Sequence, residues 1–199
     1  YKLCKTIKED INISHIPVIL LTARDDRQSQ ISGYKNGADG YLSKPFEVEM
    51  LMELIRNRLK NREYTKKRYL NAGLIPTPEE STISLTDETF LIKLNSIIQE
   101  NIENSNLGIQ FICQEVGLGR SSLYNKLKAL TGMGANEYIS KLRIEKAITL
   151  ISGTDMPFSE IAEKTGFTTP SYFSTAFKQY TGETPSQYKE RKKKGLAGK

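Results

Sequence analysis

Blocks of apolar and polar residues alternate along the first 60 residues in an order that predicts helices and strands in turn. The continuously apolar, β-branched run PVILLTA (17–23) predicts a buried strand, and DGYLSKP (39–45) predicts a second one. Helical patterns lie at KLCKTIKED (2–10), DDRQSQISGYKNG (25–37) and EVEMLMELIRNRLKNR (47–62). This order is typical of parallel strands joined by right-handed crossovers. Two strands are too few for a complete sheet, so residues 1–60 are predicted to form a partial α/β fragment.

The remainder of the chain has a helical pattern throughout. Residues 61–85 contain AGLIPTPEESTIS, whose Pro, Gly, Ser and Thr residues predict a linker. Apolar residues then recur at helical spacing without an alternating strand pattern, so residues 86–189 are predicted to form an all-helical domain. Residues 190–199 are a basic tail, interpreted as a solvated, disordered end in preference to a phosphate clamp. The predicted fold class is mainly α.

An internal duplication divides the helical part into two similar halves. IQFICQEVGLGRSSLYNKLKALTG (109–132) matches FSEIAEKTGFTTPSYFSTAFKQYTG (158–182), with Gly117 and Gly132 aligned to Gly166 and Gly182. The one-residue difference in offset lies in a connection, where insertions are tolerated best. Each copy is a helix, a turn containing glycine and a second helix, which is the helix-turn-helix pattern.

The second helix of each copy has an apolar face and a polar face. The predicted buried residues are Leu123, Leu127 and Leu130 in the first copy and Phe173, Phe177 and Tyr180 in the second. The opposite faces carry Ser121, Tyr124, Asn125 and Lys128, and Ser171, Thr175 and Lys178, with Tyr172 at the edge. Hydroxyl and amide side chains of this size reach base edges, so double-stranded DNA is the predicted ligand. A polar face that meets only water would explain one such helix, but two equivalent helices favour DNA.

Charge and cysteine content change this picture little. The net charge is +6, and residues 56–69 and 189–199 hold most of the basic excess, which is weak support for nucleic-acid binding. Cys4 and Cys113 are interpreted as reduced cysteines of a cytoplasmic protein. The longest apolar run, IPVILLTA, is too short to span a membrane, so no membrane contact is expected. The chain begins without Met, and the N-terminus is expected to be a cut edge.

The helical part resembles the AraC-type DNA-binding domain in GLGRSSLYNKLKALTG, NEYISKLRIEKAITLI and IAEKTGF…SYFSTAFKQYTGETPSQYK. The resemblance implies seven helices, transcription regulation and two recognition helices joined by a helix at 136–152. The predicted DNA-binding residues are Arg120, Ser121, Tyr124, Asn125, Lys126 and Lys128 in the first copy and Thr168, Thr169, Ser171, Tyr172, Thr175 and Lys178 in the second. The family often has a long basic or amide side chain where Pro170 and Thr175 stand. Weaker base readout is therefore expected from the second copy.

The first part, in SHIPVILLTA and ADGYLSKPF, resembles the last two strands of a response-regulator receiver domain. The resemblance implies that Thr22 and Lys44 contact a phosphoryl group, that Pro45 is cis and that Tyr41 changes rotamer. In the family, the phosphoacceptor aspartate and the Mg²⁺-binding acids lie on earlier strands, and none of Asp10, Asp25, Asp26 and Asp39 is assigned to these roles. No phosphoacceptor, metal ligand, cofactor or catalytic residue is therefore expected here, and Mg²⁺ is expected only in an intact receiver. His15 is interpreted as structural.

Together these patterns predict a sequence-specific DNA-binding transcription regulator of a two-component system, similar to the end of a Bacteroides-type hybrid sensor kinase. The alternative is a phosphorelay protein–protein module that uses residues 38–60, with DNA binding secondary. An enzyme has no support, because metal-ligand spacing, a nucleophile elbow and a P-loop are all missing from the sequence. Further expected partners are RNA polymerase, an upstream histidine kinase domain and a second copy paired through the open edge of PVILLTA.

Overall fold

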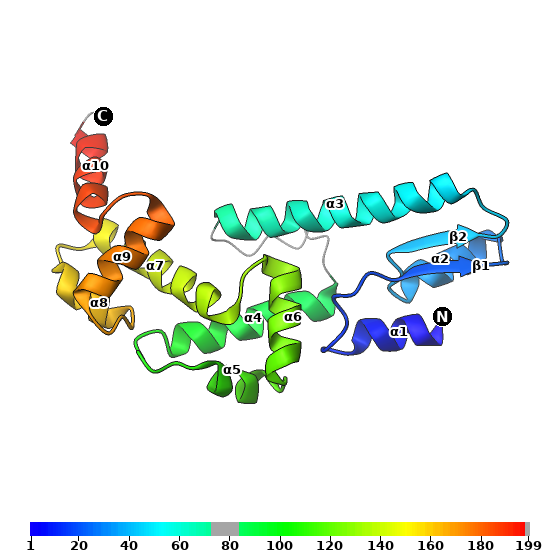
Figure 1. The fold of residues 1–199 in the computed structure, drawn as a ribbon, viewed down its shortest axis with the longest axis horizontal. Coiled ribbons are helices and arrows are strands. Elements are labelled where there is room, and N and C mark those ends of the chain that lie inside the picture. Colours follow the sequence, from blue (N-terminus) through cyan, green and yellow to red (C-terminus); the bar gives the residue numbers. More distant parts are fainter. Residues whose placement is uncertain (73–83, 198–199) are drawn as a thin grey trace. The chain divides into compact units, whose positions relative to one another are not determined.

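Residues 1–72 and 84–197 are described by a computed structural model, and this part of the chain contains ten helices and two strands (Figure 1). It divides into two units. The first unit holds residues 1–93 and 116–133, and the second holds residues 94–115 and 134–199. The division therefore passes through the predicted helical domain. None of the described helices is long and apolar enough to cross a bilayer.

The first unit begins with the predicted α/β fragment. Strands β1 (Ile19–Thr22) and β2 (Gly40–Ser43) are parallel, with Ile19 opposite Gly40 and Thr22 opposite Ser43. Helix α1 (Lys2–Glu9) precedes them and α2 (Arg27–Lys35) joins them. Asp26 is the N-cap residue of α2, and its carboxylate accepts a hydrogen bond from the Ser29 N–H at 2.8 Å. The prediction of two parallel strands among helices is confirmed.

Helix α3 (Val48–Ala72) is longer than the sequence pattern predicts. The predicted linker began at residue 61, but residues 61–72 continue the helix. The segment KNREYTKKRYLNA (60–72) lacks Pro and Gly and is rich in residues of good helix propensity, which explains the extension. Helix α3 packs against α6 (Arg120–Thr131), which belongs to the same unit. The remaining predicted linker residues, 73–83, lie outside the described part.

Helices α4 (Leu85–Glu100) and α6 both bury apolar side chains in the first unit. Phe90 and Leu91 of α4 are at most 2% exposed. The predicted apolar face of α6 is confirmed, because Leu123, Leu127 and Leu130 are buried. The helix ends at Gly132, which has a left-handed φ of 78°.

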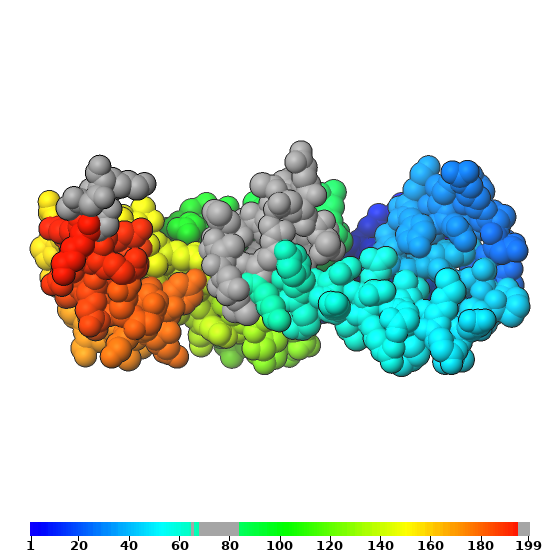
Figure 2. Space-filling model, turned by 90° about the horizontal axis from the view of Figure 1, so that it is seen from above, coloured from blue at the N-terminus to red at the C-terminus, as the bar shows by residue number. Residues whose placement is uncertain are grey.

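The second unit contains α5 (Ile109–Val116, whose last residue belongs to the first unit), α7 (Ala135–Gly153), α8 (Phe158–Lys164), α9 (Pro170–Thr181) and α10 (Pro185–Ala197). Helices α4 to α10 are the seven that the sequence predicted. In Figure 2, α9 (orange) and α10 (red) lie side by side, in agreement with their packing. Residues 190–197 belong to α10, so the prediction of a disordered tail is wrong for them.

A row of aromatic rings forms the centre of the second unit. The ring centroids of Phe167 and Phe173 are 5.3 Å apart, those of Phe173 and Phe177 are 5.7 Å apart, and those of Phe177 and Tyr188 are 5.6 Å apart. Aliphatic residues of α7 and α8 surround this row: Ile144, Ala147, Ile151, Ile161 and Ala162. The row connects the turn before α9, α9 itself and α10, so Phe173 and Phe177 anchor α9 in the core.

Two glycines of the second unit have left-handed backbones but different surroundings. Gly166 has a φ of +73°, and a Cβ there would lie 2.2 Å from the Ile102 carbonyl oxygen and 2.8 Å from the Arg143 guanidinium. Gly182 has a φ of +84°, and a Cβ there would have no heavy atom of the described residues within 4 Å beyond its immediate chain neighbours. Gly166 is therefore required for close packing as well as for its backbone conformation.

We expect Gly182→Ala to lower the free energy of unfolding by about 1–2 kcal/mol, the cost of a left-handed alanine. Gly166→Ala should cost at least about twice as much, because its methyl group also meets a backbone carbonyl. Urea unfolding of both variants measures the difference. Equal costs would contradict the packing role of Gly166.

Candidate nucleic-acid interface

The polar face of α6 is open to solvent. Five of the six residues predicted to contact DNA in the first copy are exposed or half-buried, namely Arg120, Ser121, Tyr124, Asn125 and Lys128. Tyr124 is 54% exposed although its ring is large. The opposite face is fixed by Leu123, Leu127 and Leu130, so these side chains project from a firmly packed helix. Their donors and acceptors suit base edges and phosphates.

Lys126 departs from this pattern, and its prediction as a DNA contact is wrong. Its side chain is completely buried and forms an ion pair with Asp87 of α4. Its Nζ also donates to the Ser14 hydroxyl at 2.7 Å and lies 5.1 Å from the centre of the Phe90 ring. Burial lowers the pKa of Lys126, and the Asp87 carboxylate opposes that shift. Position 126 is three residues after Leu123 and four before Leu130, which places it on the buried face.

The polar face of α9 is also open to solvent. All six residues predicted to contact DNA in the second copy are exposed: Ser171, Tyr172, Thr175 and Lys178 on α9, and Thr168 and Thr169 just before it. The hydroxyl of Thr169 accepts a hydrogen bond from the Tyr172 N–H at 3.1 Å and caps the helix. The hydroxyl of Thr175 donates to the Ser171 carbonyl at 3.1 Å. These bonds occupy part of the hydrogen-bonding capacity of both hydroxyls.

Tyr180 corrects a second expectation from the sequence. It is 41% exposed rather than buried, and its hydroxyl donates to the Glu145 carboxylate of α7 at 3.2 Å. Burial raises the pKa of Glu145 and also raises the pKa of Tyr180. The Lys141 ammonium lies 3.7 Å from the same carboxylate. Tyr180 thus fastens the end of α9 to α7 through a polar contact instead of entering the aromatic row.

Arg143 of α7 is a residue that the sequence reasoning missed. Its Nη2 donates to the Asn104 carbonyl at 2.7 Å, and its guanidinium lies 6.0 Å from the centre of the Phe167 ring. Its Nε is buried and has no hydrogen-bond partner among the described residues, and burial lowers the pKa of Arg143. Arg143 supports the turn that leads into α9. The sequence signal that could have identified it is the position of Arg143 between the apolar residues Leu142 and Ile144.

Three of the four residues that the receiver resemblance singled out, Thr22, Lys44 and Pro45, lie at the carboxyl ends of β1 and β2, and Tyr41 is the second residue of β2. Lys44 donates its backbone N–H to the Thr22 carbonyl at 2.6 Å, and the peptide bond between Lys44 and Pro45 is cis. Tyr41 is buried, and its hydroxyl donates to the Arg24 carbonyl at 2.7 Å. The Lys44 side chain is exposed. Parallel pairing therefore brings Thr22 and Lys44 together at one end of the sheet, and the Tyr41 hydroxyl reaches the segment that follows β1.

The same end of the sheet does not fit the Mg²⁺ ion that a receiver domain implies. The exposed Asp25 and Asp26 follow β1, and the Asp26 carboxylate already caps α2. The described residues contain no group of three or more His, Cys, Asp and Glu side chains that could hold a metal ion. The side chains present supply a cation and a hydroxyl for an anion, and no set of carboxylates for a divalent cation.

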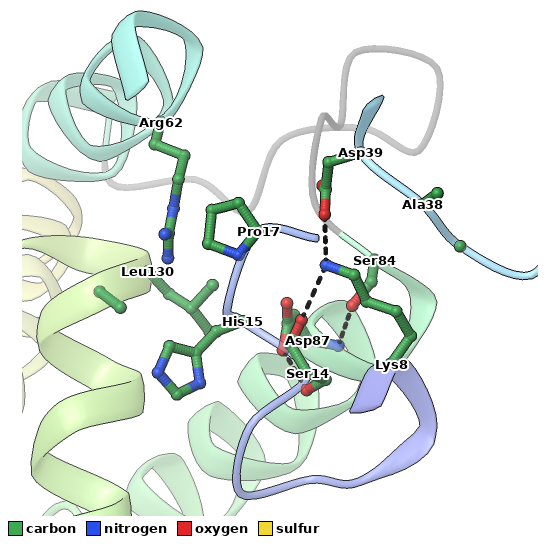
Figure 3. Close-up of a pocket in the computed structure, with 12 residues that line it drawn as sticks. Lys8, Ser14, His15, Pro17, Ala38, Asp39, Arg62, Ser84, Asp87 and Leu130 are labelled. Carbon is green, nitrogen blue, oxygen red and sulfur yellow. Dashed lines mark hydrogen bonds and ion pairs between the residues drawn. The ribbon is translucent and has the colours of Figure 1, made fainter. Parts of the chain in front are cut away.

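A pocket of the first unit lies beside the loop before β1 (Figure 3). Lys8 forms an ion pair with Asp39 at 2.6 Å and donates to the Ile16 carbonyl at 2.8 Å. His15 and Arg62 also line the pocket. The His15 Nδ1 atom is buried and has no hydrogen-bond partner among the described residues. Burial lowers the pKa of His15, and the Lys126 charge lowers it further.

Comparison with known proteins identifies both parts of the chain. Residues 112–191 match the model of a helix-turn-helix domain family, and residues 1–56 match the response regulator receiver domain. Residues 112–191 are an AraC-type helix-turn-helix domain, preceded by part of a receiver domain. The AraC-type domain contains α6 and α9, and the receiver segment contains β1 and β2.

Individual relatives agree with this division. Histidine kinase P4 of Formosa agariphila is 42% identical over 190 residues, which are 96% of this chain and 14% of that protein. The HTH-type transcriptional activator RhaR of Salmonella dublin is 34% identical over 102 residues, 51% of this chain and 36% of the activator. An AraC-type transcriptional regulator structure from Chromobacterium violaceum has a TM-score of 0.50 at 25% identity, covering 53% of this chain and 93% of that one. The chain thus spans only 14% of the length of Histidine kinase P4 and 36% of the length of RhaR.

Two lysines of α6 provide a test of the buried ion pair. We expect Lys126→Met to lower the free energy of unfolding by about 3–5 kcal/mol, because it leaves the Asp87 carboxylate buried without its counter-ion. Lys128→Met, two residues away on the exposed face, should change it by less than about 0.5 kcal/mol. Urea unfolding measures both. The double variant Lys126→Met/Asp87→Leu should recover most of the loss, and failure to do so would contradict the assignment of the pair.

His15 gives a prediction of pH dependence. Because its pKa is lowered in the folded protein, the unfolded chain takes up a proton that the folded chain does not as pH falls below about 6.5. The stability contributed by neutral His15 is therefore lost as pH falls from about 6.5 to its lowered pKa. The chain has one histidine, so His15→Asn should flatten the pH profile of stability in that range. Parallel profiles for the two proteins, measured by urea unfolding, would contradict this.

Proposed function

We propose that the chain binds double-stranded DNA in a sequence-specific manner and regulates transcription as part of a two-component system. One observation carries the proposal. Two helices that each follow a left-handed glycine, Gly117 and Gly166, bury an apolar face and expose short polar side chains on the other. The AraC-type and receiver matches support this function, as does the similarity to an activator named RhaR.

The two recognition helices have different roles in this proposal. On α6, Asn125 pairs with adenine, and Arg120 and Lys128 contact guanine or phosphate. On α9, Lys178 is the one cation of the predicted set, and the methyl groups of Thr169 and Thr175 suit thymine contacts and groove shape. The first helix therefore supplies more affinity than the second. In this proposal the two helices read successive major-groove segments of one duplex.

The proposal also includes three partners besides DNA. The similarity to Histidine kinase P4 supports placement of this chain at the output end of a hybrid sensor kinase, with a histidine kinase domain upstream. RNA polymerase is the partner through which a bound regulator would act. A second copy of the chain would pair through the edge of β1 that β2 leaves open.

Selection of bound sites from a random duplex pool tests sequence-specific binding directly. The wild-type chain should enrich a consensus with two separated segments, and binding should weaken steeply with salt because phosphate contacts release counterions. Enrichment without a consensus, or weak salt dependence, would instead favour the protein–protein module.

Footprints of Arg120→Ala and Thr175→Ala on the selected duplex test the division of labour between the two helices. We expect a loss of about 1–3 kcal/mol for Arg120→Ala and a smaller one for Thr175→Ala, because the arginine carries a charge and several donors. An equal or larger loss from Thr175→Ala would contradict this division.

A further inference from the structure

Three elements of the first unit meet at one buried polar cluster formed by Ser14, Asp87 and Lys126. The Ser14 hydroxyl donates to the Asp87 carboxylate at 2.7 Å and accepts from the Lys126 Nζ at 2.7 Å. Lys126 and Asp87 form the ion pair described above. All three residues are at most 3% exposed. Ser14 comes from the receiver segment, Asp87 from the start of α4, and Lys126 from the recognition helix α6.

The loop that carries Ser14 is itself held firmly. The Ser14 N–H donates to the Asp10 carbonyl at 2.8 Å. The Lys8 Nζ donates to the Ser14 carbonyl at 3.3 Å (Figure 3) and to the Ile16 carbonyl at 2.8 Å. The Thr86 hydroxyl of α4 donates to the Lys8 carbonyl at 3.0 Å. Ser14 is therefore presented to Lys126 by an ordered part of the receiver segment.

The geometry suits a contact that positions α6 without covering its DNA-reading face. Lys126 lies on the buried face of α6, whereas Ser121, Tyr124, Asn125 and Lys128 lie on the open face. A buried ammonium group has three donors to satisfy, and the Ser14 hydroxyl supplies an acceptor besides the Asp87 carboxylate. Loss of that hydroxyl would leave the ammonium undersatisfied and α6 less firmly held.

We propose that the receiver segment docks on the first helix-turn-helix unit through the Ser14–Asp87–Lys126 cluster and thereby holds α6 in its DNA-binding orientation. Ser14, Asp87 and Lys126 are positioning residues in this view, since none of them contacts DNA. The DNA-binding consequence rests on the proposed function. The docking contact itself does not, so the two can be tested separately.

Hydrogen exchange of the full chain without DNA tests the docking contact. Ser14→Ala should speed amide exchange along α6 by about tenfold to a hundredfold and leave α9 unchanged, as expected for loss of one hydrogen bond to a charged group. Ser32→Ala is the matched control, because Ser32 is a serine of the same segment on α2, away from the cluster. No change in α6, or equal changes in α6 and α9, overturns the proposal.

Binding to the duplex selected by the wild-type chain tests the consequence. Ser14→Ala should weaken binding by about threefold to tenfold. In double-mutant cycles its effect should be non-additive with Arg120→Ala on α6 and additive with Thr175→Ala on α9. Additivity with both variants would show a general loss of stability and overturn the positioning role. If the wild-type chain selects no duplex, the proposed function fails, and the exchange experiment alone decides whether the receiver segment docks.

Discussion

A helix that reads DNA must be held rigidly by one face while the opposite face stays open, and under the proposed function this constraint applies to both α6 and α9. The two copies meet it by different means. In the second unit α9 is held by a row of aromatic rings, from Phe167 to Tyr188, in an apolar environment. In the first unit α6 is held by leucines and by one buried charge, Lys126. The two copies therefore share a sequence pattern but differ in their cores, one aromatic and the other built from leucines and a buried ion pair.

The difference matters because apolar packing and a buried ion pair respond differently to disturbance. The hydrophobic stabilisation of buried aromatic rings depends on the area removed from water and is non-directional. A buried ion pair contributes little net stability over an apolar pair of the same volume, but loss of either partner leaves a charge stranded in a poor environment. The Lys126–Asp87 pair thus favours one arrangement of α6 and α4 over neighbouring ones. Such selectivity suits a helix whose side chains must reach defined base edges.

Local sequence patterns predicted the elements of this structure better than its long-range contacts. The periodicity of apolar residues and the turn glycines were sufficient to predict α6, α9 and the two parallel strands, because these signals lie within a few residues of one another. Lys126 was misjudged because its partners, Asp87 and Ser14, lie 39 and 112 residues away. Tyr180 was misjudged for the same reason, since Glu145 is 35 residues away. The spacing of Lys126 from Leu123 and Leu130 indicated the buried face of α6. The prediction of a DNA contact relied instead on the positive charge of Lys126.

The two functional ends of the receiver segment are joined by a single strand. Ser14 lies before β1, and Thr22 lies at its carboxyl end beside Lys44. Four steps of about 3.3 Å separate Val18 from Thr22, which makes about 13 Å of extended chain. This stretch is hydrogen-bonded at both ends, since the Asp39 and Gly40 N–H groups donate to the Val18 carbonyl and the Lys44 N–H donates to the Thr22 carbonyl. The paired backbone of β1 therefore gives the two ends of the segment a continuous physical connection.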